Sequence, residues 1–463
     1  MYLTNCLEIF LFVGVNVFHA MALVETEGVE TIPESERDRD FWQIFTIWAG
    51  FSIVITNFLL GSLTVGAGLV TGIAALIISV LLVGAIVYLG TKIAAEEGTA
   101  GTTAMRAAFG INGRAIPALA TVLATVGWFG VQTGIVASST AGILTSFGVE
   151  FPYMFEVLAL VFGIAMALVA IFGYEWIEYL NKIAVPIMTI LLALVVYQIG
   201  TQYGFSVSAS GEGMSFWSAL NVIPAATAAF LIVAMDYGRY GSSDDTSGAS
   251  LGATIAWVVF GTALAVIGIL AAQAAGDWNP VNIMVELGLG WVGLLLLVAG
   301  SWTTNVTNVY VGGIALSQLT GLDRVQMTTL TGLFGTVLAI AGIFSFGGIN
   351  AFLGALTITL VPTTGVLLVH YFLFENGLDR AALFQRGGKY WYLSGWHPAA
   401  VVAWFVGAVY AIWANGWIPG LEGASYLVPA LTSALVGGAI YFGLKNPVEN
   451  WISSRSGSAE AAD

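Results

Sequence analysis

The strongest constraint on this chain is a series of long apolar runs that begins near Phe41 and continues almost to the C-terminus. We distinguish twelve, at residues 42–66, 69–92, 115–146, 155–173, 183–201, 217–236, 250–274, 291–318, 327–346, 349–372, 398–416 and 425–444. A helix needs about 20 apolar residues to cross a bilayer, whereas barrel strands alternate over about ten. Helices also satisfy their own backbone hydrogen bonds in lipid. The sequence therefore predicts an all-α polytopic membrane protein with 12 transmembrane helices.

The composition agrees with this reading. Hydrophobic residues make up 58% of the 463 residues and charged residues only 9%, which is too apolar for a soluble protein of this size. Cys6 is the single cysteine, so an internal disulfide and a cysteine-based metal site are both excluded.

The basic residues fix an expected orientation. All 13 lysines and arginines fall outside the apolar runs or, for Lys92, at the end of one: Arg37, Arg39, Lys92, Arg106, Arg114, Lys182, Arg239, Arg324, Arg380, Arg386, Lys389, Lys445 and Arg455. With twelve spans, every one of them lies on the same side of the membrane. The positive-inside rule makes that side cytoplasmic, so we expect a multi-pass protein of the cytoplasmic membrane with both termini inside the cell.

The region before the first run is expected to be a cytoplasmic tail, residues 1–41. Its first part has no basic segment and no small-residue cleavage site, so it does not resemble a signal peptide. Met21 opens an acidic segment, and we expect residues 1–20 not to belong to the functional protein.

The eighth run contains an unusual polar stretch, Ser301 to Asn308. At helical spacing Gly300, Thr303 and Thr304 share one face, so two hydroxyls and one carbonyl can converge on a point. Neutral oxygens arranged in this way suit a small hard cation. The alternative is that these hydroxyls bond back to their own helix or to a neighbouring one.

The third run contains a second candidate site. Trp128 and Gln132 lie one turn apart on one helix face, which places an aromatic plate beside an amide. Such a pair suits a flat polar ring. The alternative is an interfacial tryptophan and a glutamine that bonds to another helix.

No Lys, Arg, Asp or Glu falls in the middle of any run, and Glu156 and Asp236 lie at run ends. A proton relay usually needs a carboxylate or histidine at membrane depth. An enzyme needs a nucleophile, a base and an orienting group in one place. The sequence therefore disfavours proton coupling, a charged substrate and an enzyme.

Four motifs together resemble the nucleobase-cation symporter family one, which includes cytosine permeases and hydantoin transporters. They are Gly28-Val29-Glu30-Thr31-Ile32-Pro33-Glu34, Gly127-Trp128-Phe129-Gly130, Asp236-Tyr237-Gly238-Arg239-Tyr240 and Trp302-Thr303-Thr304-Asn305. The resemblance implies a fold similar to that of the sodium-coupled leucine transporters, with helices broken in spans 1 and 6. The implied divisions are a first five-helix repeat at 42–201, an inverted second repeat at 217–372, two peripheral helices at 398–444 and a cytoplasmic tail at 445–463.

The resemblance also implies a sodium site. Its ligands would be the carbonyl oxygens of Ala49, Ser52 and Gly300 and the hydroxyls of Thr303 and Thr304. Sodium would be the coupling ion, and no other cofactor is implied. At the position of Gly300 the cytosine permeases have Asn. The backbone carbonyl is present with either residue, so the implied ligand is unchanged.

For the substrate, the resemblance implies that Trp128 stacks on the ring and that Gln132 and Asn305 bond to it. Thr125, which stands where cytosine permeases have Gln, is also expected to bind the substrate, and Gln132 is more similar to the hydantoin transporters. In span 6 the family places an aromatic over the substrate. Thr227 occupies that position here, and we expect Phe230, one turn on, to substitute.

The sequence thus predicts a sodium-coupled transporter that imports a neutral, cytosine-like nucleobase or a related heterocycle by alternating access. The alternative within transport is a proton-coupled or uncoupled carrier of hydantoin, allantoin or a hydroxymethylpyrimidine-type ring. From another class, a channel or a membrane receptor stays open, although the polar residues cluster rather than form a continuous stripe. The expected partners are the small heterocycle and the lipid bilayer, without nucleic acid.

Overall fold

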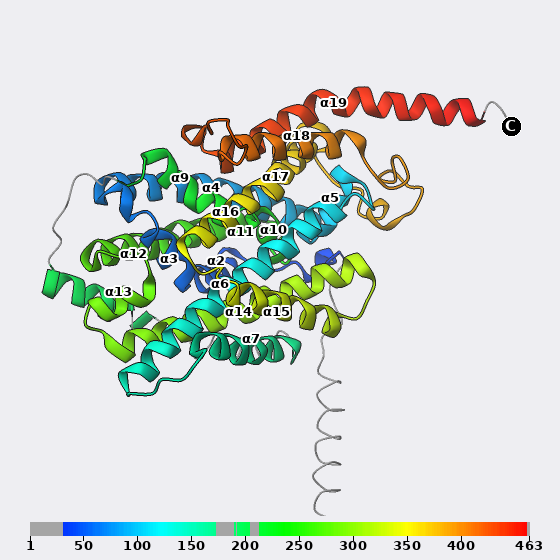
Figure 1. Cartoon of the computed structure of the whole chain (residues 1–463). Helices are drawn as coiled ribbons and strands as arrows, with labels where there is room; N and C mark the ends of the chain where they lie inside the picture. The colour runs from blue at the N-terminus through cyan, green and yellow to red at the C-terminus, as the bar shows by residue number, and fades with distance from the viewer. Residues whose placement is uncertain (1–30, 173–188, 191, 204–212, 461–463) are drawn as a thin grey trace, which may run out of the picture.

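The computed structural model describes residues 31–172, 189–190, 192–203 and 213–460. In these residues the chain is helical, and its only β contacts are two isolated bridges, Arg39 with Gly241 and Leu393 with Trp396. Figure 1 shows the helices gathered in one bundle. Helices α18 (Pro398–Ala414) and α19 (Pro429–Glu460) lie together at one edge, where the end of α19 projects from the bundle (Figure 1).

The first predicted span is a broken helix. Its halves, α2 (Phe41–Ser52) and α3 (Ile55–Ser62), meet at a bend of 56°. The α2 helix begins with a capping box in which Asp40 and Gln43 bond to each other's backbone nitrogen. At the break, the Asn57 amide donates to the Ser52 carbonyl at 2.8 Å, which satisfies an acceptor that the helix end leaves free.

The sixth predicted span is interrupted at residues 227–229, although it forms one membrane span, Phe216–Gly238, without the sharp bend of the first. Its halves are α9 (Phe216–Ala226) and α10 (Phe230–Gly238), and Pro224 lies in the last turn of α9. Proline cannot donate to a helical hydrogen bond, which weakens the helix at this end. The chain crosses the break in a tight turn, since Phe230 N donates to the Thr227 carbonyl at 2.8 Å.

The two halves of the chain show the same order of elements. After its broken helix, each half has a long helix, then a short one, and then the longest helix of that half. In the first half these are α4 (Leu69–Glu97), α5 (Gly101–Phe109) and α6 (Ala115–Ser146). In the second half they are α11 (Thr246–Ala256) continued through a π-helical turn (Trp257–Gly261) into α12 (Thr262–Ala275), then α13 (Pro280–Glu286) and α14 (Gly290–Thr320). This order is what a five-helix repeat predicts.

The remaining described helices complete the bundle. They are α7 (Met154–Phe172), Leu192–Thr201, α15 (Arg324–Ile340), α16 (Phe346–Thr359), α17 (Val361–Val369) and the π-helical turn His370–Glu375. Residues 183–188 and 191 of the predicted run 183–201 lie outside the described residues, as does the segment 1–30. Residues 429–444 of the predicted run 425–444 belong to the longer helix α19, which continues to Glu460 through most of the expected tail 445–463.

Seven of the described helices are long and apolar enough to cross a membrane, and the bent pair α2 and α3 makes an eighth candidate. Leu192–Thr201 and α18 are apolar but shorter. The protein is therefore a multi-pass membrane protein, whereas the count of twelve stays a prediction.

Close packing of small residues holds the broken first span. A side-chain carbon on Gly61 would collide with the Ala265 carbonyl, and one on Gly268 would collide with the Phe58 carbonyl. These glycines let α3 and α12 approach until their backbones touch, as small residues do between membrane helices. The break at the end of α2 is thus held at a fixed place in the bundle.

Candidate substrate and cation site

Helices α6 and α14 form the framework of the candidate site, and they carry seven of its predicted residues. They run antiparallel, because Asn305 of α14 bonds to Thr133 of α6 while Gly312, further along α14, packs against Thr125, earlier in α6. At this register Gln132 lies at the level of Asn305. The two sequence motifs in the third and eighth runs are therefore brought side by side.

The oxygens of α14 converge as the helical spacing predicts. The Thr303 hydroxyl lies 3.2 Å and the Thr304 hydroxyl 3.1 Å from the carbonyl oxygen of Gly300. Both hydroxyls donate to that carbonyl, which is also the arrangement of ordinary helix-internal bonding. Their lone pairs stay available to a cation, because a hydroxyl that donates still accepts.

The other proposed ligands lie at the end of α2, directly before the break. The Ala49 carbonyl accepts from Ile53 N at 3.0 Å. Ser52 is fully buried, and its hydroxyl has no hydrogen-bond partner among the residues that the structure describes. The second half of this span, α3, packs against α14. The described hydrogen bonds do not join Ala49 or Ser52 to the threonines of α14, so one site built from both helices stays a prediction.

Trp128 and Gln132 face different surroundings. The Trp128 ring is half-buried and meets Phe352 of α16 edge to face, with ring centroids 5.3 Å apart. Gln132 is only 1% exposed, and in the described part of the chain its amide oxygen has no hydrogen-bond partner. An unpaired buried polar group is unfavourable, so this oxygen is ready to accept from a donor that enters the protein.

Thr125 and Asn305 make contacts between and within helices. The Thr125 hydroxyl donates to the Val122 carbonyl at 3.0 Å, and its side chain packs against Gly312. The Asn305 amide nitrogen lies 3.1 Å from the Phe129 carbonyl and 3.5 Å from the Met166 sulfur of α7. Only the amide oxygen of Asn305 lacks a partner among the described residues.

Thr227 and Phe230 flank the break in span 6. The Thr227 hydroxyl donates to the Ile223 carbonyl at 2.7 Å and so closes the last turn of α9. The Phe230 ring lies in an aromatic cluster, with centroid distances of 4.8 Å to Trp257, 5.5 Å to Phe51 and 5.8 Å to Trp48. This cluster joins the breaks of spans 1 and 6. The cluster was not predicted from the sequence. The spacing of Trp48 and Phe51, one helical turn apart, was the available signal.

Asp236, the first residue of the motif at the end of span 6, has a structural role. Its carboxylate accepts from Gly101 N at 2.9 Å, at the start of α5, where the preceding residue Ala100 offers no side-chain cap. The carboxylate therefore serves as an N-terminal cap supplied by another helix. The sequence could not assign this contact, because the two residues lie 135 positions apart.

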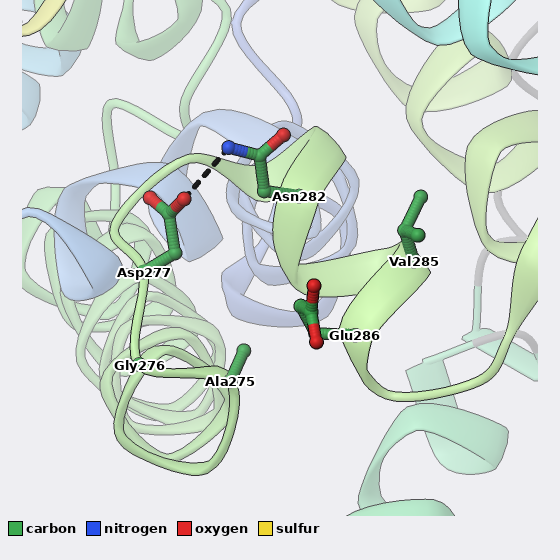
Figure 2. A pocket seen from close by; sticks show the side chains of 6 residues that line it. All are labelled: Ala275, Gly276, Asp277, Asn282, Val285 and Glu286. Atoms are coloured by element: carbon green, nitrogen blue, oxygen red, sulfur yellow. Dashed lines mark hydrogen bonds between the residues drawn. The ribbon is translucent and has the colours of Figure 1, made fainter.

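The structure also has a pocket of about 240 Å³ between α12 and α13, lined by Ala275, Gly276, Asp277, Asn282, Val285 and Glu286. Figure 2 shows the Asp277 carboxylate bonded to the Asn282 amide, at 2.6 Å. None of the predicted site residues lines this pocket. The described residues hold no group of three or more His, Cys, Asp or Glu side chains that could bind a metal.

Comparisons with known proteins agree with this architecture. The family described as "Permease for cytosine/purines, uracil, thiamine, allantoin" matches residues 31–430. The cytosine permease of Escherichia coli strain K12 is 25% identical over 410 residues, which cover 86% of this chain and 90% of the relative. The hydantoin permease of Microbacterium maritypicum is 26% identical over 415 residues, covering 82% and 81%.

Solved structures show the fold. The chain resembles Mhp1, a nucleobase-cation-symport-1 family transporter, in a closed conformation with bromovinylhydantoin bound, at a TM-score of 0.74, 19% identity and coverage of 94% and 96%. The inward-facing conformation of Mhp1 gives a TM-score of 0.76 at 19% identity and coverage of 93% and 96%. These likenesses confirm the predicted leucine-transporter-like fold. Because the family match spans most of the chain, the protein belongs to the nucleobase-cation symporter family of permeases, and it is a transporter rather than an enzyme.

Proposed function

We propose that this permease is a sodium-coupled transporter that imports a neutral nucleobase, or a closely related heterocycle, across the cytoplasmic membrane by alternating access. The observation that carries the proposal is the pair Trp128 and Gln132. It combines a half-buried indole with a buried amide oxygen that has no described partner, one turn apart on α6. A planar ring with a polar edge matches both groups at once.

The proposed substrate class rests on this pair and on the relatives. Stacking on an aromatic plate contributes about 1–3 kcal/mol whatever the ring, so hydrogen bonds have to select among rings. The Gln132 amide oxygen selects an N–H donor, which cytosine, uracil and hydantoin all carry. Relatives described as cytosine and hydantoin permeases support both pyrimidines and hydantoins as candidates.

The proposed coupling ion rests on the oxygens of α14. Two hydroxyls beside the Gly300 carbonyl offer neutral ligands, and the Ser52 hydroxyl at the break in span 1 is buried without a described partner. Sodium prefers such oxygens, and broken helices expose carbonyls to it. Ala49, Ser52, Gly300, Thr303 and Thr304 are the proposed ligands.

Radiolabelled uptake into proteoliposomes tests the proposal directly. The panel contains cytosine, uracil, purines, hydantoin and allantoin, each with and without an inward sodium gradient. We expect a sodium-dependent uptake of one pyrimidine or hydantoin. Uptake that follows an imposed pH gradient and ignores sodium would support the proton-coupled alternative instead.

A further inference from the structure

The C-terminal end of α4 is the meeting point of an unusually dense set of polar contacts. The Tyr371 hydroxyl, in the π-helical turn that ends the tenth span, lies 2.7 Å from the Glu96 carboxylate and 2.9 Å from the Glu97 carboxylate. Glu97 also accepts from Leu378 N at 3.0 Å and lies 3.4 Å from the Arg380 guanidinium. Glu97 is 5% exposed, so these bonds form in a largely dry environment.

Two arginines complete the cluster by binding the end of the α4 backbone. Helix α4 ends at Gly98 in the left-handed conformation, and its last carbonyls lack helical partners. Arg37 donates to the carbonyls of Ala95 and Glu96, at 2.8 and 3.0 Å, and Arg380 donates to the Glu96 carbonyl at 2.9 Å. Cations at this end also interact favourably with the helix dipole.

Arg37 connects the segment that precedes the first span to this cluster. Its side chain is fully buried, and Glu34 bridges it to Arg380, at 3.1 Å and 3.5 Å. Burial lowers the pKa of Arg37, and the nearby Arg380 charge lowers it further, while Glu34 opposes both. Two residues later, the backbone of Arg39 bonds to Tyr240 and Ser242, beyond the end of span 6. The cluster therefore joins the ends of spans 1, 2, 6 and 10.

The tenth span is in turn fastened to the peripheral helix α19. Buried His370 lies 2.8 Å from the Tyr441 hydroxyl of α19. Gly365 of α17 packs so closely on Ala434 that a side-chain carbon would collide with its carbonyl. The end of span 10 is thus fixed on one side to α19 and held on the other side to α4.

We propose that Glu96 and Glu97, with Tyr371 and Arg380, form a cytoplasmic latch that holds this transporter closed toward the cell interior. This inference rests on the proposed alternating-access function and on the orientation that the basic residues predict. In this proposal, substrate leaves to the cytoplasm through a path between the ends of these spans. Opening such a path breaks the bonds between α4 and span 10. Glu96 and Glu97 belong to α4, whereas Tyr371 belongs to span 10, which is fixed to α19.

Distance measurements between two spin labels test the latch. In a Cys6→Ala background, cysteines replace Asp38, beside Arg37, and Gln385, in the loop after span 10. Both residues are exposed, so labels at these positions leave the cluster intact. Double electron–electron resonance then reports how far the start of span 1 lies from the loop after span 10.

Arg380→Gln removes the charge that contacts Glu97 and Glu34, and Tyr371→Phe removes only a hydroxyl. We expect each to raise the population of long distances at least threefold. Arg386→Gln is the matched control, because Arg386 is exposed in the same loop and has no described contact. It should reproduce the distribution of the parent protein.

Identical distributions for Tyr371→Phe, Arg380→Gln and Arg386→Gln would overturn the latch. Melting in detergent checks that the variants are folded, and Tyr371→Phe keeps the shape of the side chain. The measurement needs neither sodium nor substrate. If the uptake panel failed while the distances still shifted, the latch would stand and only the transported species would need revision.

Discussion

The side-chain nitrogen of Asn305 lies 3.0 Å from the hydroxyl oxygen of Thr133, and this bond ties α14 to α6 at the level of the candidate substrate site. Asn305 is fully buried and its nitrogen also reaches the Phe129 carbonyl. The residue therefore positions the helix that carries the proposed sodium ligands. Its amide oxygen is the part left for a substrate.

The first prediction concerns stability. Asn305→Ala removes the donor of these contacts and leaves buried acceptors unpaired, so we expect a loss of about 1–3 kcal/mol in the free energy of unfolding. Gln132→Ala is the comparison, since its amide oxygen has no described partner to lose. Denaturant unfolding in detergent measures both. Equal losses would show that the two amides have the same structural role.

The second prediction concerns stacking. Trp128→Ala removes the aromatic plate, and a loss of about 1–3 kcal/mol corresponds to binding weakened by about 5- to 150-fold. Trp128→Phe keeps part of the ring area and should keep part of the affinity. Equilibrium binding of the labelled substrate measures the effect. Unchanged affinity in Trp128→Ala would place the substrate away from α6.

The third prediction concerns selectivity. Gln132→Ala should change which rings compete for uptake, because the polar edge of the preferred ring loses its acceptor. Thr121→Val is the matched control: Thr121 lies on the same helix outside the predicted site, and its hydroxyl bonds to the Pro117 carbonyl. A competition panel of pyrimidines, purines and hydantoins is the readout. If both variants kept the profile of the parent, Gln132 would not contact the substrate.

The sequence was most informative where the geometry is local. The convergence of Gly300, Thr303 and Thr304 follows from helical spacing alone, and the structure shows it. The apolar runs also predicted the helices well, because crossing a bilayer fixes both length and composition. The resemblance added the breaks in spans 1 and 6, which apolar periodicity does not reveal.

Contacts between distant helices were out of reach. The direction of the Asn305 amide depends on α6 and α7, and the cluster around Phe230 draws on Trp48, Phe51 and Trp257 from other elements. No single segment encodes such an arrangement. Phe230 was proposed from its position in span 6, but its aromatic neighbours became visible only in the structure.

The fourth prediction concerns the cap that span 6 supplies to α5. Asp236→Ala leaves Gly101 N without its acceptor, and loss of a helix cap costs about 0.5–2 kcal/mol of stability. Asp236→Asn keeps an acceptor oxygen and should lose less. Thermal unfolding of the two variants is the measurement. Equal losses for Asn and Ala would mean that the negative charge, and not the acceptor oxygen of the cap, is what Asp236 contributes.

The fifth prediction concerns sodium. Since coupled binding is reciprocal, sodium should raise substrate affinity by the same factor by which substrate raises sodium affinity. Thr304→Val keeps the side-chain shape and removes one of the oxygens beside Gly300, so it should raise the sodium concentration needed for half-maximal uptake. Substrate affinity without sodium should stay nearly unchanged. Thr307→Val is the matched control, because the Thr307 hydroxyl lies 3.4 Å from the Thr303 carbonyl, one turn away from the proposed site.

The pH dependence separates this prediction from the proton-coupled alternative. Threonine hydroxyls bind sodium without titrating, so the coupling factor should stay nearly flat from about pH 6 to 8, the range in which a histidine relay changes charge. Paired titrations of sodium and substrate across that range measure it. If Thr304→Val and Thr307→Val had the same sodium requirement as the parent, the hydroxyls of α14 would be helix-internal donors only, because their bonds to the Gly300 carbonyl already account for them without an ion.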